Sequence, residues 1–391
     1  MKVWARLIVF AAAGAAAAAW SPPASALEDG STPGRYVYVP NRASADIAVI
    51  DTATDRVVAR VAVGKVPHQV VVSAALNKLV ASNTQDNTIS IVDLATLEVE
   101  ATVALDSEPE HMALGPNGRL LAVGNIGAGT VSLVSLAANR ELARIDGLFE
   151  PHNLTFSRDG ALLYVANLGA NHVSVIDVAA RRVVNEIAVA EPTAFAAVDG
   201  GRSGAFQGII NVTETLDGGL GFAAHGESDR LAVIDLETGE RVKTLKLGDQ
   251  PWRAYATPDG RYMLVPNNGD ATVSVISTAS LEVVATLPGA EDMTGINSAG
   301  HGATAFVISR GEDKVVVLDL VEMRQVGEIR LPSSPETGVV TPDGRKLYVA
   351  LSGSNRVAVI DTENHKLVTM IDDVGEEPWG ATMVGARNYC H

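Results

Sequence analysis

The feature of this sequence that most constrains its fold is an internal repeat of about 42 residues. One part of the repeat, residues 46–60, reads DIAVIDTATDRVVAR, and it recurs as NHVSVIDVAARRVVN from Asn171 and NRVAVIDTENHKLVT from Asn355. Val, Ile and Leu alternate with other residues in each copy, which predicts two strands that each bury one face. The short polar segment between them, such as Asp-Thr-Ala-Thr, is typical of a tight turn.

Two further strands are predicted before each of these hairpins. One is an apolar segment such as LLYVAN, at residues 162–167, and the other follows a proline, as in PHNLTF from Pro151. The repeating unit is therefore four short antiparallel strands, which we call A, B, C and D. A four-stranded unit of about 40–45 residues, repeated in line, is typical of a β-propeller blade. The leading prolines are Pro67, Pro109, Pro151, Pro192, Pro251, Pro335 and Pro378, and Glu291 is assigned to the same place in the remaining copy.

The two ends of the repeat array predict how the ring closes. The segment from Tyr36 to Val63 supplies strands B, C and D without strand A, whereas the segment from Pro378 to Val384 supplies strand A alone. We expect these segments to complete one blade together, which hides the sheet edges. The fold class is then all-β, an eight-bladed β-propeller of four-stranded blades. Seven blades are the alternative if the unit that begins at Pro192 is irregular, and its extra residues, Gly200–Leu216, are expected between strands A and B.

The first 26 residues are predicted to be a signal peptide. Lys2 and Arg6 precede a short apolar run, and Ala24-Ser25-Ala26 resembles a cleavage site. The apolar run is shorter than the roughly 20 residues that span a bilayer. We therefore expect cleavage near Ala26, a periplasmic or secreted protein, and a single propeller domain over residues 27–391. The one cysteine, Cys390, excludes an intrachain disulfide and a cysteine-based zinc or iron–sulfur site.

The charge of the chain limits its partners. The formal net charge is −16 at pH 7, whereas nucleic acids and anionic membrane surfaces bind clustered Lys and Arg. We expect no nucleic-acid partner and no insertion into a membrane. The expected state is a monomer, with an envelope protein or an electron-transfer protein as the candidate partner.

The sequence YVAN at residues 164–167, followed by HVSVIDVAARRVV, resembles the YVTN β-propeller repeat family. The resemblance extends over nearly all of residues 27–391. Eight blades in an exported chain are similar to the cytochrome d1-type haem propeller of nitrite reductases, whereas seven blades would be more similar to YncE-like proteins. The resemblance implies the propeller fold, but such propellers include cofactor binders, enzymes and scaffolds, so it does not fix the function.

Four histidines are predicted to face one rim of the central channel. His68 and His152 directly follow leading prolines, and His111 lies one place further along. His225 stands at the end of a strand B, where most other copies have asparagine. Converging imidazoles suit copper, another transition metal or haem iron. The alternative is that these are rim histidines hydrogen-bonded to neighbouring loop carbonyls.

A second set of residues near the same rim suits a flat organic ligand. Trp252 and Trp379 also follow leading prolines, and Arg253 and Met293 are assigned one place further along. Tryptophan stacks on aromatic ligands and arginine pairs with carboxylates, which together favour a haem-type tetrapyrrole. The alternative is that the tryptophans are wedges between blades. There is no CxxCH motif, so a covalently attached c-type haem is excluded.

These residues support three classes of function. The first is an exported propeller that binds a metal ion or a haem-type cofactor in its funnel. The second is an enzyme that uses the same site for redox chemistry, with Glu110 or Asp292 as acid or base; lactonase or lyase activity rests on fold analogy alone. The third is a periplasmic scaffold for protein–protein interaction without catalysis. The sequence leaves open whether the protein is an enzyme.

Overall fold

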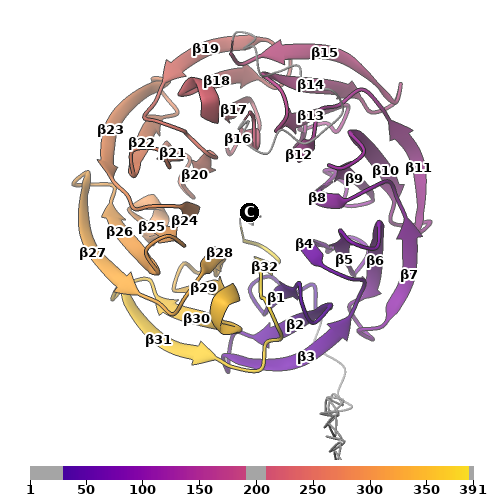
Figure 1. The fold of residues 1–391 in the computed structure, drawn as a ribbon, viewed down its shortest axis with the longest axis horizontal. Helices are drawn as coiled ribbons and strands as arrows, with labels where there is room; N and C mark the ends of the chain where they lie inside the picture. The colour runs from indigo at the N-terminus through magenta and orange to yellow at the C-terminus, as the bar shows by residue number, and fades with distance from the viewer. Residues whose placement is uncertain (1–29, 191–207, 387–391) are drawn as a thin grey trace, which may run out of the picture.

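Eight four-stranded antiparallel sheets surround a central channel in the computed structural model (Figure 1). The structure describes residues 30–190 and 208–386; the predicted signal peptide, Pro192 and Cys390 lie outside these ranges. The eight sheets confirm the eight-bladed propeller and exclude the seven-bladed alternative. The unit assigned to Pro192 contributes a complete blade, whose four strands lie within residues 213–246.

The blades are numbered here in chain order, with strands A to D running outward from the channel. Blade 1 contains β32 (Thr382–Met383), β1 (Tyr36–Asn41), β2 (Asp46–Asp51) and β3 (Arg56–Ala62). Blade 2 contains β4 (Pro67–Ser73), β5 (Lys78–Asn83), β6 (Thr88–Asp93) and β7 (Val99–Ala104). Blade 3 contains β8 (Pro109–Leu114), β9 (Leu120–Asn125), β10 (Thr130–Ser135) and β11 (Arg140–Ile145). Blade 4 contains β12 (Pro151–Phe156), β13 (Leu162–Asn167), β14 (His172–Asp177) and β15 (Arg182–Ala188).

The second half of the ring repeats this order. Blade 5 contains β16 (Thr213–Glu214), β17 (Leu220–His225), β18 (Arg230–Asp235) and β19 (Arg241–Lys246). Blade 6 contains β20 (Tyr255–Ala256), β21 (Tyr262–Asn267), β22 (Thr272–Ser277) and β23 (Glu282–Pro288). Blade 7 contains β24 (Met293–Ala299), β25 (Thr304–Ser309), β26 (Lys314–Asp319) and β27 (Arg324–Arg330). Blade 8 contains β28 (Pro335–Val340), β29 (Lys346–Leu351), β30 (Arg356–Asp361) and β31 (Lys366–Ile371).

Helix is nearly absent from the described residues. Three single 3-10 turns follow strands of blades 5, 7 and 8: η1 (Gly226–Ser228), η2 (Gly300–Gly302) and η3 (Ser352–Ser354). Within residues 30–190 and 208–386, no helix is long and apolar enough to cross a membrane.

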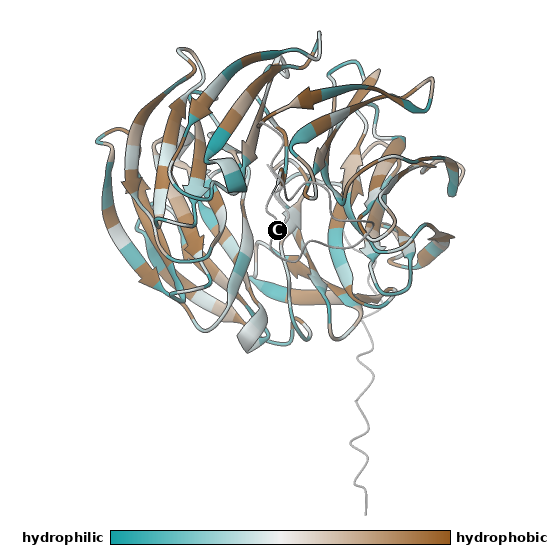
Figure 2. Cartoon of the chain, turned by 45° about the horizontal axis from the view of Figure 1, so that its top comes forward, coloured by the Kyte–Doolittle hydropathy of each residue, from teal (hydrophilic) through white to brown (hydrophobic). Residues whose placement is uncertain are grey.

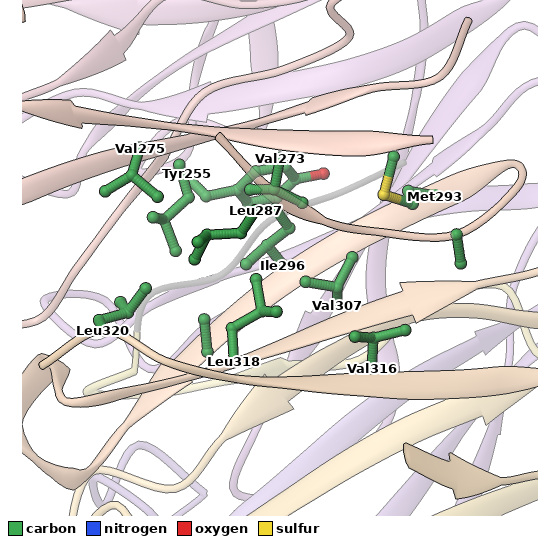
Figure 3. Close-up of a cluster of buried hydrophobic side chains, with 13 residues drawn as sticks. Tyr255, Val273, Val275, Leu287, Met293, Ile296, Val307, Val316, Leu318 and Leu320 are labelled. Atoms are coloured by element: carbon green, nitrogen blue, oxygen red, sulfur yellow. The ribbon is translucent and has the colours of Figure 1, made fainter. Parts of the chain in front are cut away.

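The core is distributed between the blades. Eight clusters of buried apolar side chains lie one at each interface between neighbouring sheets. Figure 2 shows apolar residues along the strands and polar residues in many connecting loops. In the cluster between blades 6 and 7, Tyr255 and Leu287 pack against Ile296 and Val316 (Figure 3). Each blade therefore buries both faces only when its neighbours are present.

The ring closes as the two ends of the repeat array predict. Strand β32 pairs with β1 through Val37↔Met383 and Tyr38↔Thr382. At the C–D turn of blade 1, Asp55 Oδ2 lies 2.7 Å from Nζ of Lys346 in blade 8. The buried Tyr348 hydroxyl donates a hydrogen bond to the same carboxylate. Blade 1 is thus joined to blade 8 by apolar packing, a strand contributed by the C-terminal segment, and a polar contact.

The long insertion lies in a different place from the one predicted. Ile209 forms a β-bridge with His225, the last residue of strand B in blade 5, and β16 follows Ile209 in the chain. In other blades the leading proline makes the equivalent pair, so Ile209 occupies the leading position of blade 5. Of the predicted insertion, Gly200–Leu216, residues 208–212 precede β16, residues 213–216 form β16 and the turn after it, and residues 200–207 lie outside the described ranges. The prediction between strands A and B was wrong because Pro192 was taken as the leading residue of the blade.

Candidate functional site

A β-bulge at the start of strand A places two consecutive residues of the chain at the channel mouth. In blade 2, Pro67 pairs with Asn83 but the next pair is Val70↔Ala81, so two residues oppose one. The same shift follows Pro109, Pro151 and Pro335. A bulge re-aims side chains that a regular strand would send to opposite faces. The bulge pairs in blades 2, 3 and 4 are His68-Gln69, Glu110-His111 and His152-Asn153.

Three of the predicted histidines come together through these bulges. His111 Nε2 lies 3.0 Å from His152 Nε2, and the two ring centroids are 3.8 Å apart. The His68 ring stands edge-on to His111, with centroids 5.0 Å apart. His68, Glu110 and His111 offer ligand atoms that all lie within 4.8 Å of one another. We call His68, Glu110, His111 and His152 the histidine cluster.

The spacing within the cluster is that of a hydrogen bond between the two imidazoles, and it also matches two ligands of one metal ion. Two nitrogens about 2.0–2.1 Å from an ion lie about 2.9 Å apart at a right angle and about 3.3 Å apart at the tetrahedral angle. The Nε2 atoms of His111 and His152 are 3.0 Å apart. His152 Nδ1 lies 3.1 Å from the Ile210 carbonyl oxygen, so this nitrogen carries the proton and Nε2 presents its lone pair. A backbone carbonyl in this position is typical of histidines that bind metals.

The residue before the end of strand B sets how closely the bulges approach. In blade 3 this residue is Gly124, and a Cβ there would lie 2.6 Å from the Pro151 carbonyl oxygen. In blade 2 it is Ser82, whose hydroxyl donates a 2.6 Å hydrogen bond to the Glu110 carbonyl. Because Gly124 and Ser82 have small side chains, the bulge of the next blade can pack closely against strand B. This packing helps to bring His152 against His111.

Glu110 is the carboxylate of the histidine cluster. Burial raises the pKa of Glu110 from 4.5 to about 7; the Arg42 charge opposes this shift and the Glu150 charge adds to it. A carboxyl group with a pKa in this range exchanges its proton readily near neutral pH. Glu110 is therefore able to serve as an anionic ligand or as a base beside the imidazoles.

Trp379 and Arg42 form one wall of the site. The Trp379 ring centroid lies 6.1 Å from that of His68, and the Arg42 guanidinium carbon lies 4.2 Å from the centroid of the Trp379 ring. The Trp379 N–H of the main chain donates to the Pro40 carbonyl oxygen, which fixes the residue to blade 1. Sequence reasoning missed Arg42, because a residue in a B–C loop carries no signal that it stacks on a tryptophan.

A cavity of 710 Å³ continues into the channel next to the histidine cluster. Its lining includes the second bulge residues of blades 2 and 4, Gln69 and Asn153, together with Asn211 and Arg253. Arg253 is buried, with 5% of its surface exposed, and its guanidinium lies 5.7 Å from the centroid of the Tyr255 ring. Trp252 is half-buried, does not line this cavity, and is held to blade 6 by a main-chain bond to Pro266.

The structure places Met293 in the core rather than at the channel mouth. Met293 pairs with Ser309 as Pro67 pairs with Asn83, so it occupies the leading position itself. Its side chain is 1% exposed and packs between blades 6 and 7 (Figure 3). The sequence alignment that put Glu291 in that position was wrong by two residues, because this blade has no proline to mark it. Thr294 and Gly295 are the residues that follow.

His225 lies apart from the histidine cluster. Its Nε2 is 2.6 Å from Asn171 Oδ1 of the preceding blade. The asparagines at this position in other blades also bridge to the preceding blade; Asn83, for example, accepts from the Gly64 N–H. His225 therefore replaces a residue that joins neighbouring blades. Burial lowers the pKa of His225 from 6.5 to about 4.

His225 should make the stability of the ring fall in acid. The pKa of His225 is lower in the folded chain than in the unfolded chain. Between pH 6.5 and about 4, the imidazole is therefore protonated in the unfolded chain but neutral in the folded chain. The loss begins as pH falls below 6.5 and reaches about 2 kcal/mol at pH 5. The His225→Asn variant, which restores the residue of five other blades, should lose this component. Urea unfolding at pH 7.5 and pH 5 measures it, and an unchanged pH dependence in the variant would contradict the assignment.

Comparison with known proteins relates this chain to a family. Residues 70–387 match the YNCE-like beta-propeller family. The seven-bladed beta-propeller protein Rv1057 of Mycobacterium tuberculosis is 30% identical over 129 residues, which are 32% of this chain and 33% of that protein. Protein NirF of Stutzerimonas stutzeri is 26% identical over 201 residues, which are 47% of this chain and 50% of NirF. The matches thus span half or less of these relatives.

Two solved structures have similar folds. The hydrazine synthase of Kuenenia stuttgartiensis has a TM-score of 0.56 at 25% identity, covering 76% of this chain and 95% of that one. The dihydro-heme d1 dehydrogenase NirN, in complex with DHE, has a TM-score of 0.73 at 17% identity, covering 93% of this chain and 78% of that one. The second likeness shows the fold alone. With the family match over most of its length, the chain belongs to the YNCE-like beta-propeller family.

Proposed function

We propose that the protein binds a transition-metal ion through His68, His111 and His152 at the mouth of its channel. The observation that carries this proposal is the 3.0 Å separation of the His111 and His152 Nε2 atoms, with His68 and Glu110 beside them. Neutral imidazole binds zinc, copper, iron and nickel, and three protein ligands leave a position open for water or a substrate. Glu110 would act beside that position as a fourth ligand or as a base.

The geometry favours a free ion over the iron of a tetrapyrrole held by both imidazoles. A planar macrocycle occupies four positions around its iron and leaves two on opposite sides. Two nitrogens in those positions lie about 4 Å apart, since each bond is about 2.0 Å. The separation of 3.0 Å suits neighbouring ligands of one ion rather than opposite ones. A tetrapyrrole at this site would therefore use one of the two imidazoles.

The second candidate is a haem-type tetrapyrrole with one histidine ligand. The similarity to NirF, and the likeness of fold to NirN in complex with DHE, motivate it. Trp379 lies beside His68 as a stacking wall, and Arg42 and Arg253 provide positive charge for carboxylates. When bound, the iron of such a group would supply redox chemistry. The residues of this chain would hold it, orient it and limit the access of water.

One set of measurements tests both candidates. The full chain is analysed for metal content and visible absorption, and the metal-free protein is titrated with Zn²⁺, Cu²⁺ and haemin. Binding of one Zn²⁺ or Cu²⁺ per chain, with no haemin band, supports the ion site. A haemin complex whose absorption band requires a single histidine supports the second candidate. A chain that binds none of the three probes overturns both and leaves the interaction scaffold.

We further propose that the protein acts outside the cytoplasm, following export by residues 1–26. The apolar run after Lys2 and Arg6 motivates this proposal. A partner in the envelope, such as an electron-transfer protein, would approach the rim that carries the histidine cluster. Fractionation of cells that make the full chain, with N-terminal sequencing of the product, tests export and cleavage.

A further inference from the structure

The cavity next to the histidine cluster has its own chemistry. It holds 710 Å³, which lies within the range of about 300–1,000 Å³ for sites that bind small organic molecules. Its lining comes mainly from strands A of blades 2 to 5, so it runs along the channel rather than across the rim. The apolar part of the lining includes Val70, Met112, Leu154 and Val212.

The hydroxyl groups of the lining are largely committed to the fold. Thr155 donates to the Val212 carbonyl at 2.6 Å, and Thr213 donates to the Ala254 carbonyl at 2.6 Å. Thr382 donates to the Val70 carbonyl at 3.0 Å. These bonds tie strand A of one blade to strand A of a neighbouring blade. Their protons are therefore not the groups that would recognise a ligand.

The other polar groups of the lining include Gln69 of blade 2, Asn153 of blade 4 and Arg253, which precedes strand A of blade 6. Asn153 is 8% exposed, and its Nδ2 makes no hydrogen bond within the described residues. Gln69 accepts the Met112 N–H through Oε1, so that bond does not use its NH₂ group. Arg253, at 5% exposure, adds a permanent positive charge. A buried amide donor costs free energy until it meets an acceptor.

The acidic residues of the lining lie near the opposite end of strand A. Asp217 is in the A–B turn of blade 5, where it accepts from the Thr215 hydroxyl at 2.6 Å and from the Gly219 N–H at 3.0 Å. Glu214 ends β16 and is exposed. The second bulge residues, in contrast, begin strand A beside the histidine cluster. The cavity therefore has the buried donors Asn153 and Arg253 near one end, whereas Glu214, Asp217 and the exposed Arg158 lie near the other.

We propose that this cavity binds a small organic acid, with its carboxylate held by Arg253 and Asn153 and its apolar part lying along Val70, Leu154 and Val212. Arginine and amide donors match the planar carboxylate. The apolar lining distinguishes such an acid from an inorganic anion, which has no apolar surface to bury. Asn153 directly follows His152, so the carboxylate is placed next to the proposed metal ion. The binding of the acid does not depend on that ion, and it goes beyond the proposed function.

Calorimetric titration of the full chain with hexanoate, benzoate and inorganic phosphate tests this proposal, without metal and after addition of Zn²⁺. Hexanoate or benzoate is expected to bind with a dissociation constant below about 1 mM, and phosphate at least tenfold more weakly. Arg253→Met and Asn153→Ala are each expected to weaken binding by about tenfold or more. Arg158→Met is the matched control, because Arg158 lines the same cavity but is exposed. It should bind as the wild type does.

The outcomes separate the two proposals. Binding of the acid to metal-free protein, lost in Asn153→Ala, supports the cavity site whether or not Zn²⁺ binds. No binding of either acid to the wild type, or equal losses in Arg158→Met, overturns it. Phosphate binding as tight as that of hexanoate also overturns it, in favour of a general anion site. If haemin alone binds in an Arg253-dependent way, the carboxylates belong to a tetrapyrrole and the small-acid assignment is wrong. If Arg253→Met does not fold, the binding affinity of Asn153→Ala tests the proposal instead.

Discussion

Replacing His111 with alanine is expected to weaken Zn²⁺ binding by about 100-fold or more, because loss of even an outer-shell partner costs about 10–100-fold. His111 is fully buried and lies between the two other imidazoles, so its removal would take away the central member of the proposed ligand set. Competition titration with a chromophoric zinc chelator measures the affinity. Circular dichroism and urea unfolding establish that the variant still folds.

The matched control for this variant is His225→Asn. His225 is also a buried histidine of the same propeller, but it bonds to Asn171 outside the histidine cluster. Its replacement should leave the Zn²⁺ affinity within about twofold of the wild type. Equal losses in the two variants would mean that buried histidines affect binding through stability, and the cluster would not be a metal site. The variant Gly124→Ala should give an intermediate loss, because a Cβ there displaces the bulge that carries His152.

The Met383→Ala variant is expected to lower the free energy of unfolding by about 2–5 kcal/mol. Met383 is fully buried, pairs with Val37, and packs in the cluster between blades 1 and 8. It belongs to a strand A of only two residues, so few other contacts can compensate for the lost side chain. Urea unfolding followed by tryptophan fluorescence measures the change.

Val384→Ala is the control for Met383→Ala. Val384 lies next in the chain but is half-buried, and its main-chain carbonyl accepts a hydrogen bond from the Gly34 N–H. Its replacement should cost less than about 1 kcal/mol. If Met383→Ala unfolds at the same urea concentration as the wild type, the C-terminal strand does not hold the ring closed and another contact, such as Lys346 with Asp55, has that role.

The sequence alone was sufficient for the architecture because the repeat is regular. Alternating Val and Ile mark strands, and the leading prolines mark strand A in most blades. The two exceptions are the places where prediction failed. Blade 7 begins with Met293 and blade 5 with Ile209, and neither residue differs in appearance from an ordinary strand residue. The residue that begins strand A in these two blades is identified only by its pairing with strand B in the structure.

The sequence predicted which rim of the channel carries the histidines, but it did not predict which side chains meet there. Position after the leading proline placed His68, His111 and His152 on one rim, and the structure brings these three together. The sequence could not show that a bulge presents two consecutive residues, which is why Gln69 and Asn153 were missed. It also could not separate His225, because the end of strand B lies near the rim but its side chain faces the neighbouring blade. These distinctions depend on side-chain direction.

The segment that closes the ring also carries a wall of the site. Trp379 stands beside His68, three residues before the strand that pairs with β1. During synthesis this segment leaves the ribosome after the other seven blades, so the pocket has no complete boundary on the nascent chain. If the proposed site binds a ligand, we expect the complete pocket to be available only after translation and ring closure. A ligand of the proposed site would then bind to a finished propeller, in the compartment where folding ends.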